Sequence, residues 1–203
     1  MATASIDYSL FRAVNGLSGS TLADDLLRAL ANDLAAVLVV LVALVFLVPW
    51  AERRSERRNG AVLATAAAPL ALLINQPLSH LVARARPFVA HPAHTHLLLA
   101  RSPDPSFPSD HAPGAFALAF GVWLYDRAIG AVLLVLAALL SFARVYAGTH
   151  YPGDVVAGAL VGIAIASLLY LVPPLRRLIE AIARRCGELL DGLLTGRRAG
   201  PVA

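Results

Sequence analysis

Residues 34–51 read LAAVLVVLVALVFLVPWA, eighteen consecutive residues without a charged side chain. As an α-helix that rises about 1.5 Å per residue, this stretch reaches roughly the thickness of the hydrocarbon core of a bilayer. Four further apolar stretches follow, at 60–83, 112–125, 128–143 and 155–175. The pattern predicts five membrane-spanning helices. The third begins near Ser109, which puts Pro113 in its first turn, where proline is tolerated.

The composition agrees with a membrane protein. Of the 203 residues, 58% are hydrophobic and only 15% are charged, and the mean hydropathy is +0.69, which excludes an ordinary water-soluble domain. We therefore expect an all-α, polytopic transmembrane helical bundle that forms a single membrane-embedded domain over residues 1–203. The lipid bilayer is its expected partner, no nucleic acid is expected, and nothing in the sequence specifies an oligomeric state.

The two ends of the chain are more polar than its centre. Within residues 1–33, apolar side chains recur at helical spacing among charges and a Gly-Ser break lies at 18–20, which predicts an interfacial helical hairpin. A weakly hydrophobic sixth span is the alternative. Residues 34–175 form the predicted transmembrane core. Residues 176–203 are predicted to form a basic, amphipathic cytoplasmic tail.

All seventeen basic residues are arginines, and their distribution predicts the orientation of the chain. Eleven lie in one set of alternate loops: Arg53, Arg54, Arg57, Arg58, Arg127, Arg176, Arg177, Arg184, Arg185, Arg197 and Arg198. Six lie in the other set: Arg12, Arg28, Arg84, Arg86, Arg101 and Arg144. The positive-inside rule places the larger set in the cytoplasm, so the long loop after the second span and the turn after the fourth are predicted to share the outer face.

Three polar patches are predicted to meet on that outer face. They are Arg84 and Arg86 after the second span, Ser109, Asp110 and His111 at the start of the third, and Arg144, His150 and Asp154 between the fourth and the fifth. Guanidinium groups next to apolar helices are costly unless they are paired or bind an anion, and their planar geometry suits phosphate oxygens. For any single arginine, contact with a lipid headgroup is the alternative. Together the patches predict a phosphate-binding site.

The two histidines suit acid, base and nucleophilic roles in such a site. Asp154 follows His150 by four residues in the first turn of a helix that begins with proline, so its carboxylate can reach back to one ring nitrogen. That contact would fix the tautomer and leave the other nitrogen a better nucleophile. His111 is also predicted near a helix N-terminus, where an anion is favoured, and is a candidate general acid.

At these residues the chain resembles the type-2 phosphatidic acid phosphatase superfamily of membrane lipid phosphatases. Arg86-Pro87 matches the end of its first motif, and Pro108-Ser109-Asp110-His111 matches the second with Asp in place of Gly. Arg144, His150 and Asp154 match the third motif with the correct spacing. The resemblance extends from the second span to the fifth, and within the superfamily it is strongest to the bacitracin-resistance type of undecaprenyl pyrophosphate phosphatase.

Three positions depart from the family pattern. The family's first-motif lysine falls on Ser79, and because the chain has no lysine, Arg84 is the predicted replacement for its charge. Ala143 stands where the family has a serine. Asp110 brings a negative charge next to the phosphate site, which should repel the substrate unless Asp110 pairs with an arginine such as Arg84 or Arg101.

The resemblance implies a two-step phosphoryl transfer without a cofactor or a metal. His150, oriented by Asp154, would attack the terminal phosphorus while His111 protonates the leaving oxygen, and water would then hydrolyse the phosphohistidine. Arg84, Arg86, Arg144 and Ser109 would bind the phosphate oxygens, and Asp110 is the fifth residue expected in the phosphate-binding site. The expected substrate is undecaprenyl pyrophosphate at the outer face of the bacterial cell membrane. Phosphatidic acid, phosphatidylglycerol phosphate and other prenyl phosphates are the alternatives.

Two rival interpretations come from other features. His91, His94 and His96, with Asp104 nearby, have the donor types of a zinc site, although loop histidines at such short spacing are more often solvated. A transporter or other non-enzymatic membrane protein is the second rival. Against it, no charged residue lies in the middle of a predicted span and no span has the broken centre typical of transporter sites.

Overall fold

The computed structural model describes residues 6–48 and 52–195, and within these residues the regular structure is entirely helical. The elements in chain order are α1 (Ile6–Asn15), α2 (Thr21–Leu47), α3 (Arg54–Val82), α4 (Pro87–Ala90), the 3₁₀ turn η1 (Pro92–His94), α5 (His111–Trp123), α6 (Arg127–Tyr146), α7 (Pro152–Leu171) and α8 (Pro173–Thr195).

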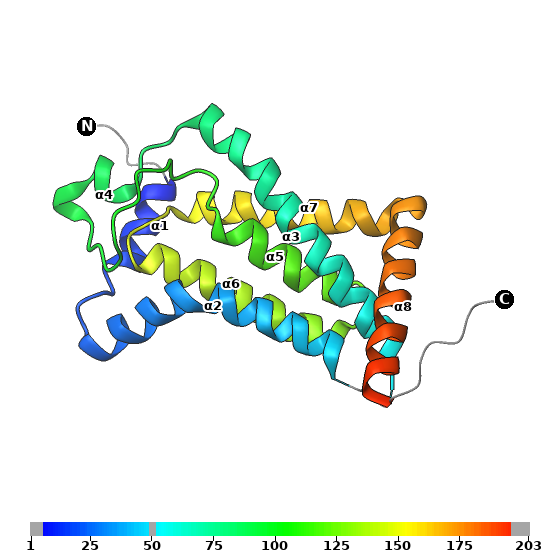
Figure 1. Ribbon diagram of the computed structural model, residues 1–203. Coiled ribbons are helices and arrows are strands. Elements are labelled where there is room, and N and C mark those ends of the chain that lie inside the picture. The colour runs from blue at the N-terminus through cyan, green and yellow to red at the C-terminus, as the bar shows by residue number, and fades with distance from the viewer. Residues whose placement is uncertain (1–5, 49–51, 196–203) are drawn as a thin grey trace.

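Five helices form a bundle in which successive helices alternate in direction (Figure 1). Helices α2, α3, α5, α6 and α7 run alongside one another. Helix α1, helix α4 and the long loop that precedes α5 lie at one end, whereas α8 crosses the other end (Figure 1). The connections after α3 and after α6 therefore meet at the end opposite to α8, as the alternation of spans predicted.

The short helix α5 lies at the centre of the bundle because small residues let its neighbours approach closely. It packs against α2, α3, α6 and α7. A Cβ atom added to Gly162 of α7 would lie 2.3 Å from the carbonyl oxygen of Pro113, and one added to Gly121 of α5 would lie 2.7 Å from the Cα atom of Ala64. Close contacts through glycine and alanine are a typical way for helices to pack in a membrane.

Four helices are long and apolar enough to cross a membrane: α2, α3 with the segment that continues to Ala90, α6 and α7. The third predicted span corresponds to α5, which has 13 residues and is only about 20 Å long at the usual helical rise. Pro113 lies in its first turn, as predicted. Multiple apolar helices make this an integral membrane protein. That α5 spans the membrane, and that a sixth span exists, stay predictions.

The N-terminal region differs from the predicted interfacial hairpin. A break does occur at the predicted place, because α1 ends at Asn15 and α2 begins at Thr21. The second arm is nevertheless part of the first span, since nothing between Thr21 and Leu47 interrupts the helix. Helix α1 also packs into the protein: the side chain of Phe11 is fully buried. The last three residues of the first predicted span, 49–51, lie outside the described residues.

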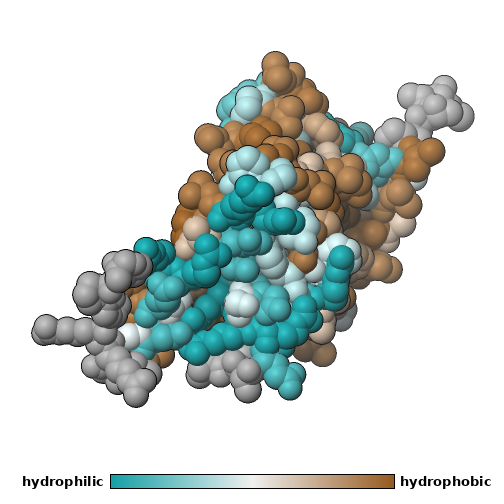
Figure 2. Space-filling model, turned by 90° about the vertical axis from the view of Figure 1, so that its right-hand side faces the viewer, coloured by the Kyte–Doolittle hydropathy of each residue, from teal (hydrophilic) through white to brown (hydrophobic). Residues whose placement is uncertain are grey.

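The C-terminal helix α8 covers the other end of the bundle. Figure 2 looks at this end and shows hydrophilic side chains gathered on it, with apolar surface on the flanks of the molecule. Arg58 near the start of α3 and Asp191 of α8 form an ion pair of 2.8 Å that ties the two helices together. The predicted basic helix after residue 175 is therefore present through Thr195, and the rest of the predicted tail, 196–203, lies outside the described residues.

Candidate active site

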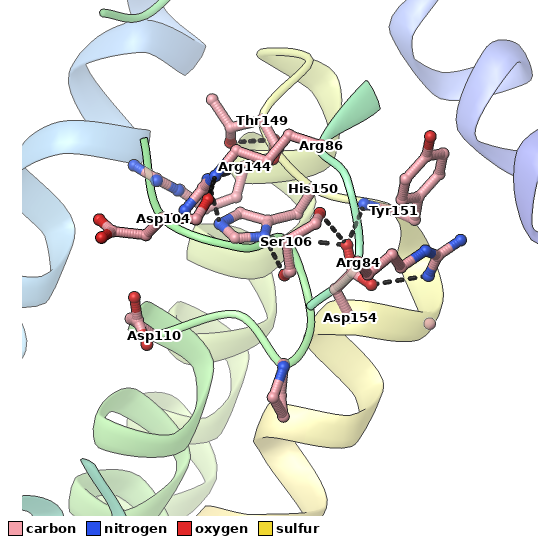
Figure 3. A network of polar contacts seen from close by, with 12 residues as sticks. Arg84, Arg86, Asp104, Ser106, Asp110, Arg144, Thr149, His150, Tyr151 and Asp154 are labelled. Atoms are coloured by element: carbon pink, nitrogen blue, oxygen red, sulfur yellow. Dashed lines mark hydrogen bonds and ion pairs between the residues drawn. The ribbon is translucent and has the colours of Figure 1, made fainter. Parts of the chain in front are cut away.

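The predicted site residues come from four separate segments that converge at the α1 end of the bundle (Figure 3). Arg84 and Arg86 lie between α3 and α4, and Ser109 and Asp110 end the loop before α5. His111 is the first residue of α5, and Arg144 lies in the last turn of α6. His150 lies in the connection from α6 to α7, and Asp154 lies in the first turn of α7. The three polar patches therefore meet, as predicted.

The His150 side chain is buried, and its two hydrogen-bond partners define its tautomer. Its Nδ1 atom lies 2.9 Å from the carbonyl oxygen of Ser106, which can only accept a hydrogen bond. Its Nε2 atom lies 3.2 Å from Nη1 of Arg86, which can only donate one. The proton is therefore on Nδ1, and Nε2 carries the free electron pair that a nucleophile needs.

The charge state of His150 follows from its surroundings. Burial lowers the pKa of His150 well below its usual value, and the positive charges of Arg86 and Arg144 lower it further. A lowered pKa means that the imidazole is neutral at pH 7. A neutral imidazole can act as a nucleophile or a general base, whereas an imidazolium cannot.

Asp154 lies next to His150 but does not orient it as predicted. The closest approach, from Asp154 Oδ2 to His150 Nδ1, is 3.9 Å, which is too long for a hydrogen bond. The same oxygen instead accepts hydrogen bonds from the Ser106 hydroxyl and from the backbone N–H of Tyr151 at 2.8 Å. Position 154 lies at the start of a helix, where backbone N–H groups compete for a carboxylate. The Ser106 carbonyl fixes the tautomer, and Asp154 holds Ser106.

Ser106 is the residue of this network that sequence reasoning missed. Its side chain is fully buried, and it contacts both His150 and Asp154. It lies three residues before Ser109, outside the motif residues that the sequence singled out. The contact to His150 uses the backbone carbonyl, which every residue type has. That contact therefore leaves no signal in the sequence.

Arg86 and Arg144 lie on the Nε2 side of the His150 ring (Figure 3). Arg86 is held by backbone carbonyls, since its Nε donates to Asp104 at 2.7 Å and its Nη1 approaches that of Thr149 at 3.3 Å. Within the part of the chain that the structure describes, no carboxylate oxygen lies within 4.0 Å of either guanidinium group. The two cations next to His150 therefore keep donors for an anion.

Two buried polar atoms of the predicted phosphate site have no hydrogen-bond partner among the described residues: the Ser109 hydroxyl and Nε of Arg144. The backbone N–H of Ser109 donates to the carbonyl of Asp154 at 3.0 Å, which ties the start of α5 to that of α7. Buried polar groups in native proteins are usually paired, so orphaned donors at one place are typical of a ligand site. Both atoms fit the predicted phosphate contact.

Asp110 is held by α3. Its Oδ1 atom accepts a hydrogen bond from Nδ2 of Asn75 at 2.9 Å and lies 3.4 Å from the side-chain nitrogen of Gln76. Its partners are thus neutral amides of α3 rather than Arg84 or Arg101. The predicted general acid His111 follows it as the first residue of α5.

Asp110 and His111 also line a cavity of about 280 Å³ between α2, α3 and α5. Its other walls are apolar: Ala35, Val39, Ala68, Leu72, Gly114, Ala115 and Leu118. One end of the cavity therefore carries the polar groups of the site, and the remainder suits a hydrocarbon chain.

Arg84 has a different environment from the other two arginines. It lies between two carboxylates, with Nη1 at 2.7 Å from Asp154 and Nη2 at 2.6 Å from Asp7. Its guanidinium group also stacks on the ring of Tyr151 at 3.8 Å. Figure 3 shows it on the Asp154 side of His150, away from Arg86 and Arg144. Ser79, the position of the family lysine, is buried within α3.

The loop histidines that suggested zinc are held apart by other contacts. The ring of His91 stacks on that of Tyr8 with 3.9 Å between centroids, and Nδ1 of His96 lies 2.8 Å from the Ser18 hydroxyl. Within residues 6–48 and 52–195, no three His, Cys, Asp or Glu side chains are grouped so that they could hold a metal ion.

A neutral imidazole beside two arginines that lack carboxylate partners suits a phosphoryl group. On a bundle of membrane-crossing helices, this arrangement defines a membrane-embedded phosphatase. The family comparison agrees, and the chain belongs to the PAP2 superfamily, whose model matches residues 59–178. The expected family and the enzymatic activity are thereby confirmed, and the non-enzymatic alternative is dropped.

Individual relatives cover most of the chain. It is 32% identical over 190 residues to the undecaprenyl-diphosphatase BcrC of Bacillus subtilis, which covers 94% of this chain and 96% of that relative. It is 32% identical to the putative undecaprenyl-diphosphatase YbjG of Escherichia coli over 77% of each chain. Among solved structures, LpxE of Aquifex aeolicus is similar with a TM-score of 0.64 and 27% identity, over 81% of this chain and 94% of that one. These findings make the protein a membrane lipid phosphatase.

Proposed function

We propose that this lipid phosphatase hydrolyses undecaprenyl pyrophosphate to undecaprenyl phosphate and inorganic phosphate through a phosphohistidine on His150. The observation that carries the mechanism is the environment of Nε2 of His150, an unprotonated nitrogen that faces Arg86 in a buried site. The substrate is supported by the names of two relatives that each match more than three quarters of the chain.

In the first step, Nε2 of His150 attacks the terminal phosphorus. A P–N bond forms as the P–O bond to the leaving undecaprenyl phosphate breaks. His111, in its imidazolium form, gives a proton to the leaving oxygen and becomes the neutral imidazole. In the second step, His111 takes a proton from water, the hydroxide attacks phosphorus, and the P–N bond breaks to release phosphate and the free imidazole. Arg86, Arg144 and the Ser109 hydroxyl hold the oxygens on which charge develops. The arginines supply the positive charge, so no metal or other cofactor takes part.

The apolar cavity next to His111 supports a lipid substrate with a long chain. A chain in the cavity between α2, α3 and α5 would bring its phosphate end to Asp110 and His111. Asn75 and Gln76 of α3 hold the Asp110 side chain, and the charge of Asp110 acts on Arg86 and Arg144.

The arginine distribution supports an outer-face site in the bacterial cell membrane. Helix α8 and the start of α3, which carry seven of the seventeen arginines, lie at the end of the bundle opposite to His150. With that end in the cytoplasm, the site faces the extracytoplasmic side, where a lipid carrier is released during cell-wall synthesis. This arrangement favours a polyprenyl carrier over phosphatidic acid or phosphatidylglycerol phosphate.

The test is phosphate release by the detergent-purified protein from undecaprenyl pyrophosphate, phosphatidic acid and phosphatidylglycerol phosphate, each with and without EDTA. We expect kcat/KM for undecaprenyl pyrophosphate to exceed the others by about tenfold or more, the ratio that about 1.4 kcal/mol of differential binding produces. A higher value for either phospholipid would overturn the substrate and leave the mechanism standing. Loss of activity in EDTA would overturn the metal-free chemistry.

The control for the mechanism is His150→Ala, matched by His94→Ala in the exposed part of the loop. We expect His150→Ala to lose about 10³-fold or more in kcat and His94→Ala to keep full activity. Rapid quenching with labelled substrate should trap an acid-labile phosphoryl group on the wild-type protein only. If His150→Ala retained about a tenth of wild-type activity, His150 would not be the nucleophile.

A further inference from the structure

The N-terminal helix α1 contacts the loop that carries His150, although no motif of the sequence analysis includes it. Phe11 of α1 is fully buried and packs edge-on against Tyr151, with 5.4 Å between ring centroids. Asn15, which is also buried, donates to the carbonyls of Tyr146 at 2.7 Å and His96 at 2.8 Å. Its Oδ1 atom accepts from the backbone N–H of His96 at 2.9 Å. Helix α1 is therefore fixed to both segments that surround the site.

Asp7, in the first turn of α1, makes two contacts at the start of α7. Its Oδ1 atom accepts a hydrogen bond from the backbone N–H of Gly153 at 2.7 Å. Its Oδ2 atom pairs with Nη2 of Arg84 at 2.6 Å. The first contact satisfies one of the backbone donors that a helix N-terminus leaves free. The second gives the Arg84 guanidinium group a second carboxylate partner besides Asp154.

Arg84 transmits the position of Asp7 to the site. Its Nη1 atom donates to Oδ1 of Asp154, while Oδ2 of the same carboxylate holds Ser106 and Tyr151. The Asp154 side chain has no exposed surface, so the attached cation offsets the cost of burying its charge. Stacking on Tyr151 and pairing with Asp7 leave Arg84 one orientation in which all three contacts form.

We propose that Asp7 is a positioning residue of this phosphatase, which holds Arg84 against Asp154 and thereby keeps Ser106 and the Nδ1–H tautomer of His150 in place. This inference rests on the proposed nucleophilic role of His150. Helix α1 is then part of the machinery of the site, and Arg84 belongs to the support of Asp154 rather than to the phosphate ligands.

The experiment compares Asp7→Asn with Asp24→Asn in the hydrolysis of undecaprenyl pyrophosphate, with kcat and KM determined separately. Asn keeps an oxygen for the N–H of Gly153 but removes the charge that faces Arg84. Asp24 is a matched control, because it lies in the same region, accepts from the Tyr146 hydroxyl at 2.7 Å and does not contact Arg84. We expect kcat of Asp7→Asn to fall about tenfold with KM unchanged, and Asp24→Asn to behave as the wild type.

A double-mutant cycle with Arg84→Gln tests whether Asp7 acts on kcat through Arg84. If Asp7 acts through Arg84, Asp7→Asn has no further effect on kcat once Arg84 is replaced. If Arg84 instead binds the substrate phosphate, Asp7→Asn frees it from a competing carboxylate, so KM falls and kcat stays, which would overturn the proposal. A lowered melting temperature with unchanged kcat per folded molecule would overturn it as well, by making Asp7 merely structural.

The failure of this inference is distinguishable from failure of the proposed function. Wild-type kcat in Asp7→Asn, with an inactive His150→Ala, refutes the role of Asp7 alone. An active His150→Ala removes the nucleophile that the positioning would serve and refutes both.

Discussion

Arginines cluster at both ends of the bundle, but their partners differ. At the α8 end, Arg57 pairs with Asp126 at 2.8 Å and Arg58 pairs with Asp191 at 2.8 Å. At the other end, Arg86 and Arg144 approach backbone carbonyls, and Arg86 also approaches His150. Among the described residues, no carboxylate oxygen lies within 4.0 Å of either guanidinium group. A paired arginine stabilises the fold, whereas a cation left without a counter-ion next to a neutral imidazole is prepared for an anionic ligand.

Replacing an arginine of the site should have the largest effect. We expect Arg144→Gln to lower kcat/KM about 100-fold or more, because one charged donor to the transferring phosphoryl group is lost. Its melting temperature in detergent should stay the same or rise, since the change removes positive charge that lacks a carboxylate partner. A large fall in melting temperature with retained turnover would mean that Arg144 belongs with the structural arginines.

A smaller effect is expected on the pH dependence of kcat/KM when the wild type is compared with Arg144→Gln. The groups that act on His150 are Arg86, Arg144, His111 and the nearby Asp154, and burial with both arginines lowers its pKa. Protonation removes the nucleophile, so the acid limb of kcat/KM in the wild type should lie below pH ~6.5, the usual histidine value. Arg144→Gln removes one of the lowering charges, so its limb should move to higher pH.

The comparison of the two profiles cancels the ionisation of the substrate, which is the same in both. Coincident acid limbs would show that the limb does not report His150, or that Arg144 does not act on it. A limb that moved to lower pH in the variant would contradict the sign of the electrostatic effect.

The smallest effect on activity is expected from the same substitution at the other end. Arg58→Gln breaks the bidentate contact with Asp191, whose Oδ2 and Oδ1 atoms accept at 3.0 and 2.8 Å. We expect the melting temperature to fall by about 2–4 °C, as for the loss of roughly 1 kcal/mol, while kcat per folded molecule stays unchanged. A loss of kcat comparable to that of Arg144→Gln would contradict the assignment of Arg58 to the structure and of Arg144 to the site.

Local patterns in the sequence predicted most of the architecture. The apolar runs predicted the helices now seen as α2, α3, α6 and α7, because the length of an uncharged run is a local property. They did not reveal that α2 begins at Thr21, because the charges before residue 34 resemble an interfacial segment although the helix is continuous. The central place of α5 depends on small residues of its neighbours, which only the packed bundle brings together.

The candidate site shows the same division. Motif spacing located His150, His111, Arg86 and Arg144, since family motifs are contiguous in sequence. It assigned Asp154 to the wrong partner, because the competing donors of a helix start and of Ser106 are visible only in three dimensions. Arg84 was likewise predicted at the phosphate, while the structure pairs it with Asp7 and Asp154.

The sequence by itself determined that this is a helical membrane protein with a histidine and arginine site at one end, because run length, charge distribution and motif spacing act over short stretches of chain. Only the tertiary structure decided which atoms support the nucleophile. The Ser106 carbonyl on His150 joins residues 44 positions apart, and Asp7 on Gly153 joins residues 146 positions apart. Such contacts depend on how the helices pack, and helix packing depends on the shapes of many side chains at once.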